Sequence, residues 1–88
     1  MTRIFSDRGF DRQFSRLPRK FQLKFYERAA LFAADPRAPL LHNHPLEGKY
    51  EGMRSINITG DLRAVYRESE NNSAFFVEIG THHQLFRS

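Results

Sequence analysis

The chain contains no cysteine and no tryptophan, and its apolar runs are short. Without cysteine it forms neither a disulfide framework nor a thiolate zinc site, which fits a reducing compartment such as the cytoplasm. The longest apolar run, Ala29 to Ala34, is far shorter than the roughly 20 residues that a membrane-spanning helix needs. The N-terminal segment is charged where a signal peptide would be apolar. We therefore expect a soluble cytoplasmic protein with no membrane partner.

The chain has only 88 residues. A chain of this length forms one domain, because a second core would need roughly 50 more residues. Nine Phe and three Tyr can build that core, since each buried aromatic side chain removes about 150 to 250 Å² from water. We expect a single domain over residues 1–88 that folds without a disulfide or a structural metal.

Acidic residues are outnumbered, because ten Asp and Glu face fourteen Lys and Arg. The formal net charge is +4 and the sequence pI is about 10.0. A positive long-range field favours anionic partners such as nucleic acid, an acidic protein or an anionic surface. Charge alone does not choose among them.

The first half of the chain has helical periodicity after a short apolar opening. A strand is predicted over residues 1–5, and helices are predicted over residues 7–17 and 18–34, separated by Pro18. The apolar stripes of the two helices are Phe10, Phe14 and Leu17 in the first and Phe21, Phe25, Ala29 and Phe32 in the second.

Basic residues recur on the outer side of this helical hairpin. They are Arg12, Arg16, Arg19, Lys20, Lys24 and Arg28. Such a surface can bind RNA phosphates. Charged residues at helical spacing are equally typical of an ordinary solvated helix face. The sequence leaves both interpretations open.

The second half changes to a period of two after a proline-containing loop at residues 35–48. Strands are predicted over residues 50–58, 62–68 and 74–80, joined by turns. In the middle strand Arg63 and Arg67 share a face with Val65, while Tyr66 faces the core. The order β-α-α-β-β-β predicts an α+β fold, with a helical hairpin packed on one face of a small, largely antiparallel sheet. The other face is expected to be open for function.

All four histidines lie in this second half, at positions 42, 44, 82 and 83. A metal site is disfavoured against isolated histidines, because His82 and His83 would point to opposite sides of an extended segment. Metal-free cleavage of RNA fits better, since the 2′-hydroxyl is the nucleophile and the enzyme supplies only a base, an acid and a cation. This chemistry needs no cofactor.

Four short motifs occur in order along nearly the whole chain. They are F-D-R-Q-F-S-R-L-P at residues 10–18, H-P-L-x-G at 44–48, D-L-R-A-V-Y at 61–66 and G-T-H-x-x-L-F at 80–86. Together they resemble the RelE/YafQ family of toxins from bacterial type II toxin-antitoxin systems. The resemblance implies a small endoribonuclease that cuts messenger RNA in the ribosomal A site and is silenced by a cognate antitoxin protein.

The resemblance also implies roles for individual residues. His44, Asp61 and His82 match catalytic positions of YafQ-type members, and Arg63 matches the phosphate-stabilising arginine of RelE-type members. Phe86 matches the aromatic residue that closes the last motif. Arg54, Asn57 and Arg67 are the further residues expected to contact substrate.

The chain departs from the YafQ pattern at two positions. Asn57 stands where a further catalytic histidine is usual, and an amide transfers no proton at neutral pH. His44 and His82 are then the acid-base pair, or else the enzyme is weak. Leu62 replaces a tryptophan, so the codon preference does not carry over.

Other interpretations of these residues stay open. Asp61 also suits a tight turn, and Phe86 can pack the C-terminal segment instead of stacking on a base. The whole chain can be a gyrase inhibitor like the related ParE toxins, although His44, Arg63 and His82 argue against this. A catalytically weak relative that still binds an antitoxin is the third alternative.

Overall fold

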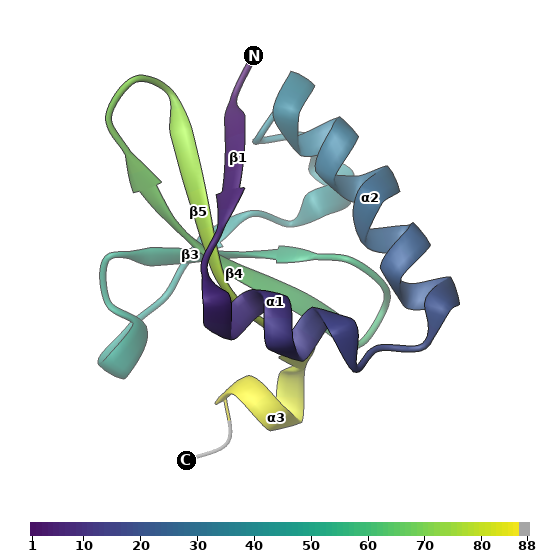
Figure 1. Ribbon diagram of the computed structural model, residues 1–88. Coiled ribbons are helices and arrows are strands. Elements are labelled where there is room, and N and C mark those ends of the chain that lie inside the picture. The colour runs from purple at the N-terminus through teal and green to yellow at the C-terminus, as the bar shows by residue number, and fades with distance from the viewer. Residues whose placement is uncertain (87–88) are drawn as a thin grey trace.

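The computed structural model describes residues 1–86 and places the helices and strands shown in Figure 1. The helices and strands in chain order are β1 (Arg3–Ser6), α1 (Arg8–Ser15), α2 (Arg19–Ala34), β2 (His44–Pro45), β3 (Met53–Asn57), β4 (Leu62–Ser69), β5 (Ser73–Thr81) and α3 (His82–Phe86). Two single turns of 3₁₀ helix, η1 (Pro39–Leu41) and η2 (Gly48–Tyr50), flank β2. The two long helices and three long strands expected from the periodicity are all present.

The five strands form one sheet in the order β1-β5-β4-β3-β2. The strand β1 runs parallel to β5, and the other neighbours are antiparallel. The helices α1 and α2 cover one face of this sheet (Figure 1). The prediction of an α+β fold with a helical hairpin on a largely antiparallel sheet is therefore confirmed.

The core between the hairpin and the sheet is built mainly from aromatic rings. Phe10 of α1 and Phe32 of α2 both contact Phe76 on β5, with ring centroids 5.9 and 5.4 Å apart. Phe32 also contacts Tyr66 on β4 at 4.9 Å, and Tyr66 is 1% exposed. Edge-to-face contacts of this kind stabilise a core beyond the area that they bury. The prediction that Tyr66 belongs to the core is confirmed.

Local signals in the sequence begin the first helix and close the hairpins. The Asp7 carboxylate accepts a hydrogen bond from the Phe10 amide at 2.8 Å and caps α1. In the turn after β3, the Thr59 hydroxyl accepts hydrogen bonds from the amides of Asp61 and Leu62. In the turn between β4 and β5, Asn71 and Asn72 both have positive φ, a conformation that Asn tolerates better than most residues. Each signal is local, so it can be read directly from the sequence.

The loop before β3 contains more structure than predicted. We expected a strand from Tyr50, but β3 begins at Met53 and Tyr50 lies in η2. Gly48 at the start of η2 and Gly52 after its end have φ of 66° and 89°, which an extended strand does not allow. Further back, the two residues of β2 pair with β3 and extend the sheet by a short edge strand.

The C-terminal segment forms a helix, which corrects the expectation that His82 and His83 lie in an extended chain. Thr81 and Gln84 make a capping box at the start of α3, because each side chain accepts a hydrogen bond from the amide of the other residue. Gly80 allows the close approach of this turn, since a Cβ there would lie 3.0 Å from Gln84 Oε1.

The second face of the sheet is partly covered, whereas we expected it to be open. Leu85 of α3 and Tyr50 of η2 pack on Val65 of β4, and all three are buried. This small apolar cluster supports the polar residues that surround it on the same face.

Candidate functional site

Two rows of residues cross the second face of the sheet, opposite α1 and α2. The strands β2, β3, β4 and β5 are paired in that order. Their pairing aligns His44, Ser55, Val65 and Glu78 in one row. The next row consists of Asn57, Arg63 and Gly80. Residues that are directly opposite in antiparallel strands present their side chains on the same face. The sheet thus brings His44, Asn57 and Arg63 to one surface, and Arg63 shares that surface with Val65, as alternation along β4 predicts.

Arg63 is the fixed cation of this surface. Its Nη1 donates a hydrogen bond to Asn57 Oδ1 on the neighbouring strand. Its Nε is buried and has no hydrogen-bond partner within residues 1–86. A guanidinium that is held from one side keeps its other donors available for two oxygens of an anion such as phosphate. Asn57 therefore positions Arg63, although it cannot transfer a proton as a histidine would.

His82 lies at the start of α3, next to the end of this second row. Its amide donates a hydrogen bond of 3.0 Å to the carbonyl of Asp61, the residue that precedes β4. Phe86 lies one helical turn later, with its ring centroid 5.1 Å from that of His82. The structure therefore brings Asp61, Arg63, His82 and Phe86 together at one end of the β4 and β5 pair. His82 and Asp61 are exposed.

His44 approaches from the opposite edge of the sheet. It is exposed on β2, and its Nδ1 lies 2.8 Å from the carbonyl oxygen of His42. Three strand spacings separate β2 from β5, which amounts to roughly 14 Å between their backbones. Arg63 on β4 lies between the two histidine-bearing segments. A phosphodiester over Arg63 could be reached by an imidazole from each side.

Tyr50 and Glu78 form a contact on this face that the sequence did not reveal. The Tyr50 hydroxyl donates a hydrogen bond of 2.8 Å to Glu78 Oε1. Burial, followed by this hydrogen bond and the Glu78 charge, raises the pKa of Tyr50 to about 12. The Tyr50 ring meets the Phe86 ring edge to face at 5.6 Å. Tyr50 thus connects β5 to the aromatic residue beside His82.

Two arginines expected to contact substrate lie away from the Arg63 row. Arg54 faces the helical side, where its Nε donates a hydrogen bond of 2.7 Å to Asn43 Oδ1. Asn43 in turn donates to the Tyr66 hydroxyl at 2.8 Å. Arg67 is on the same face as Arg63 but four residues further along β4, with its guanidinium 5.6 Å from the centre of the Phe75 ring. The structure does not bring either residue into the site.

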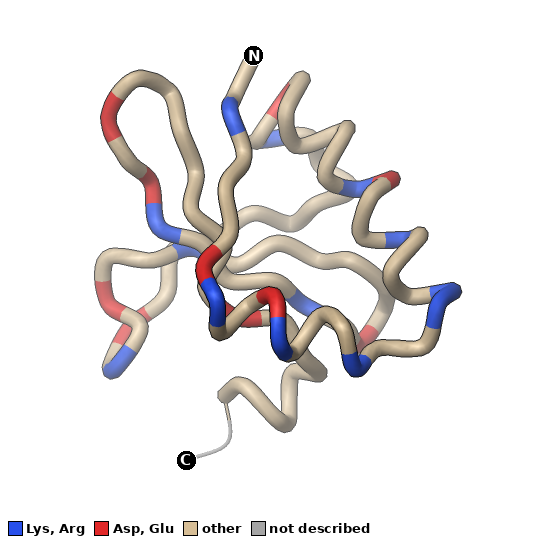
Figure 2. Tube along the Cα trace, viewed as in Figure 1, with Lys and Arg blue, Asp and Glu red and all other residues tan. Residues whose placement is uncertain are grey.

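The basic residues of the helical hairpin are spread along α1 and α2 (Figure 2), which lie on the face of the sheet opposite to Arg63. Arg12, Arg16, Arg19 and Lys20 are exposed. Lys24 and Arg28 both lie 3.4 Å from Glu27 Oε1, so part of their charge is neutralised. No helix within residues 1–86 is long and apolar enough to cross a membrane.

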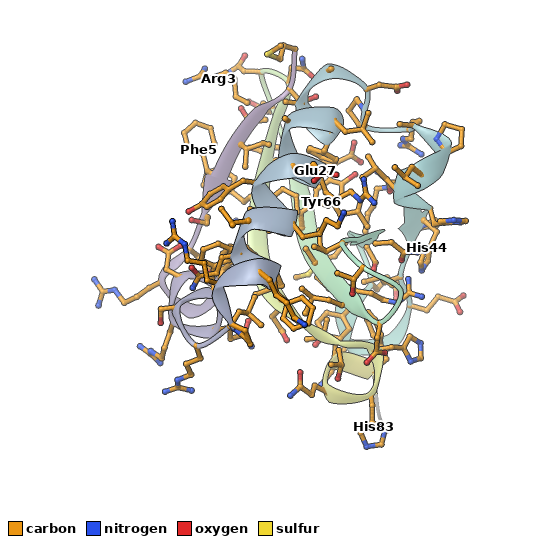
Figure 3. The ribbon with its side chains drawn as sticks, turned by 90° about the vertical axis from the view of Figure 1, so that its right-hand side faces the viewer. Arg3, Phe5, Glu27, His44, Tyr66 and His83 are labelled. Carbon is orange, nitrogen blue, oxygen red and sulfur yellow. The ribbon has the colours of Figure 1, made fainter. Side chains whose placement is uncertain are left out.

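The histidines do not gather into a metal site. In the part of the chain that the structure describes, no three His, Asp or Glu side chains are grouped so that they could hold an ion. His83 points away from the body of the molecule at the tip of α3, while His44 lies higher on the side of the sheet (Figure 3). The side chains present on the second face are suited to proton transfer and to binding an anion.

Solved structures with a similar fold include bacterial toxins. YafQ from E. coli strain BL21(DE3) has a TM-score of 0.79 at 19% identity, covering 98% of this chain and 99% of that one. A YoeB/ParE toxin from Agrobacterium tumefaciens has a TM-score of 0.75 at 20% identity, covering 92% and 99%. YafQ in the E. coli DinJ-YafQ toxin-antitoxin complex has a TM-score of 0.76 at 20% identity, covering 98% and 99%. These similarities define the fold as that of RelE-like toxins.

The family model described as bacterial toxin of type II toxin-antitoxin system, YafQ, matches residues 4–87. The chain therefore belongs to the YafQ toxin family. No protein of curated function matches the chain.

Proposed function

We propose that this protein inhibits translation as a metal-independent endoribonuclease that cleaves messenger RNA on the ribosome. The observation that carries the proposal is the Arg63 guanidinium, which is hydrogen-bonded to Asn57 on a strand that lies between β2, which carries His44, and β5, which leads to His82. A fixed guanidinium stabilises the charge that develops on phosphorus-bound oxygens in the transition state.

In the proposed reaction the RNA supplies its own nucleophile. One imidazole removes the proton of the 2′-hydroxyl, which attacks the adjacent phosphorus, and the other protonates the 5′-oxygen as its bond to phosphorus breaks. The pair of histidines consists of His44 and His82. Asp61, whose backbone carbonyl accepts the hydrogen bond of the His82 amide, is the proposed carboxylate that stabilises the protonated imidazole. The products are a 2′,3′-cyclic phosphate and a 5′-hydroxyl.

The proposed partners follow from charge and from the relatives. A chain with net charge +4 is attracted to ribosomal and messenger RNA, and the exposed arginines of α1 and α2 suit RNA phosphates. The E. coli relative was crystallised in a complex with the antitoxin DinJ. By analogy this protein is silenced by its own antitoxin, whose gene we expect beside that of the toxin.

The test is single-turnover cleavage on purified ribosomes that carry a defined messenger RNA. Wild-type protein should leave a 2′,3′-cyclic phosphate, or the 3′-phosphate that derives from it. A single 2′-deoxynucleotide on the 5′ side of the cleaved bond should abolish cleavage there. A 3′-hydroxyl product would instead indicate an activated water. Growth arrest with double-stranded DNA breaks and intact messenger RNA would indicate gyrase poisoning.

A further inference from the structure

A groove of about 480 Å³ lies between the loop after β2 and the helix α3. It is lined by Leu46, Glu47, Gly48, Lys49, Tyr50, Leu85 and Phe86. Its volume is within the range of pockets that bind small organic groups. Its lining joins the apolar cluster of the second face to the loop at residues 46–49.

The two walls of this groove belong to the two segments that carry the histidines. Leu46 follows His44 by two residues, and Phe86 follows His82 by one helical turn. The Phe86 ring contacts His82 with centroids 5.1 Å apart. One wall of the groove therefore contacts His82, and the groove lies on the face of the sheet that carries Arg63.

The side chains around the groove suit a nucleobase. Leu85 and Tyr50 are buried at 3% and 6% exposure and supply apolar surface, and the Phe86 ring is partly exposed. Lys49 Nζ lies 5.2 Å from the centre of the Tyr50 ring, where an ammonium can also bind a phosphate. Glu47 is an exposed carboxylate that can only accept hydrogen bonds when ionised.

We propose that this groove binds the base next to the cleaved bond and that Glu47 selects bases with an exocyclic amino group. Adenine, cytosine and guanine carry such a group, and uracil does not. The inference rests on the proposed endoribonuclease activity and extends it to substrate selection. A nucleobase fits better than a protein side chain, because Phe86 in the wall of the groove contacts His82, one of the two histidines of the proposed reaction.

The first experiment measures the affinity of the protein for ribosomes with a non-cleavable messenger RNA. The RNA has a 2′-deoxynucleotide at the cleaved position and one abasic nucleotide, moved through the four positions around it. We expect one position at which the loss of the base weakens wild-type binding by about 5- to 150-fold. Leu46→Phe, which fills the groove, should remove that position-specific loss. Leu40→Phe is the matched control, because Leu40 is 54% exposed and outside the groove.

The second experiment tests the role of Glu47 by removing only the exocyclic amino group from the base. Replacing adenosine at that position by purine ribonucleoside removes the amino group alone, and wild-type binding should weaken about tenfold. Glu47→Ala should bind both RNAs equally. Glu51→Ala, which removes an exposed carboxylate from the same loop but outside the groove, should discriminate as wild type does.

The experiments distinguish a failure of the groove proposal from a failure of the proposed endoribonuclease activity. Failure of wild-type protein to cleave normal RNA would refute the proposed function, while the binding assay on non-cleavable RNA still reports on the groove. Equal losses at every abasic position, or a loss that persists in Leu46→Phe, would overturn the groove proposal. Weakened binding of the antitoxin alone in Leu46→Phe would assign the groove to that protein instead. Since Leu46→Phe changes an internal contact, its thermal unfolding is compared with that of wild type.

Discussion

The two faces of the sheet are made by the same strands and differ in how their buried polar atoms are paired. On the face that α1 and α2 cover, Ile56, Ala64 and Phe76 are completely buried and the neighbouring Tyr66 hydroxyl accepts a hydrogen bond. On the other face, Ser55 Oγ and Arg63 Nε are buried without a hydrogen-bond partner within residues 1–86. Unpaired buried polar atoms cost stability. The helical face therefore stabilises the fold, and the second face retains groups whose value is chemical.

The largest effect on stability is expected from a substitution in the core on the helical face. Phe32 is 1% exposed and contacts both Tyr66 and Phe76. Phe32→Ala should lower the free energy of unfolding by about 3 to 5 kcal/mol, because it leaves a cavity. That is a large fraction of the roughly 5 to 15 kcal/mol that stabilises a domain. Urea denaturation measures the change.

The control for this experiment is on the same helix. Leu23 is 53% exposed, so Leu23→Ala should change the free energy of unfolding by no more than about 0.5 kcal/mol. If both substitutions had equally small effects, the aromatic cluster would not be the source of stability.

The complementary test removes a proposed proton-transfer group at the second face. His82→Ala should lower the single-turnover cleavage rate by about 10² to 10⁴, because it removes a proton-transfer group. It should leave urea denaturation and antitoxin affinity nearly unchanged, since the His82 side chain is exposed. His83→Ala is the matched control and should cleave like wild type, because His83 points away from the sheet (Figure 3). Equal losses from both substitutions would show that α3 acts only as a structural element.

The helical face could be predicted from the sequence because its signals are local and periodic. The stripes of α1 and α2, the Asp7 cap and the turn at Thr59 all act within a few residues. Alternation in β4 correctly assigned Arg63 and Tyr66 to opposite faces, because its eight residues are regularly extended. These elements need no knowledge of distant contacts.

The second face is harder to predict from the sequence, because irregular backbone determines which side chains lie on it. The pairing of β4 with β5 shifts between Val65 and Tyr66, so that Val65 is opposite Glu78 and Tyr66 is opposite Phe76. Strict alternation would put Glu78 on the same face as Phe76, in the core. The bulge instead turns Glu78 toward Tyr50. This change of face depends on a tertiary pairing, so alternation alone misses the contact.

The start of the helix α3 has a local signal in the sequence. Thr81 and Gln84 have the spacing of a capping box, which predicts a helix start at that point. A short helix changes the relation of the two adjacent histidines and puts His82 and Phe86 on one side of a turn. By contrast, the position of Arg54 beneath Asn43 depends on the long loop before β3. Only the folded structure shows that contact.

The smallest expected effect concerns the one hydrogen bond that joins η2 to β5 across the second face. Tyr50→Phe removes the hydroxyl that donates to Glu78. Near pH 8 the substitution should lower the free energy of unfolding by about 1 to 2 kcal/mol, since a hydrogen bond to a charged group is lost. Because the folded-state pKa of Tyr50 is raised from 10.0 to about 12, the unfolded chain ionises first as the pH rises. The wild type therefore loses this contribution to stability between about pH 10 and 12, and the variant does not.

The difference between the two proteins should thus shrink as the pH approaches 12, and urea denaturation at pH 8, 10 and 11 measures it. Burial also raises the pKa of Tyr66, but Tyr66 is present in both proteins and cancels in the comparison. Tyr26→Phe is the control, because Tyr26 is 60% exposed on the helical hairpin and its loss should leave the unfolding curve close to that of wild type at each pH. A difference between wild type and Tyr50→Phe that stays constant from pH 8 to 11 would mean that the Tyr50 hydroxyl titrates alike in the folded and unfolded chains. In that case neither burial nor the contact with Glu78 would raise the pKa of Tyr50 in the folded chain.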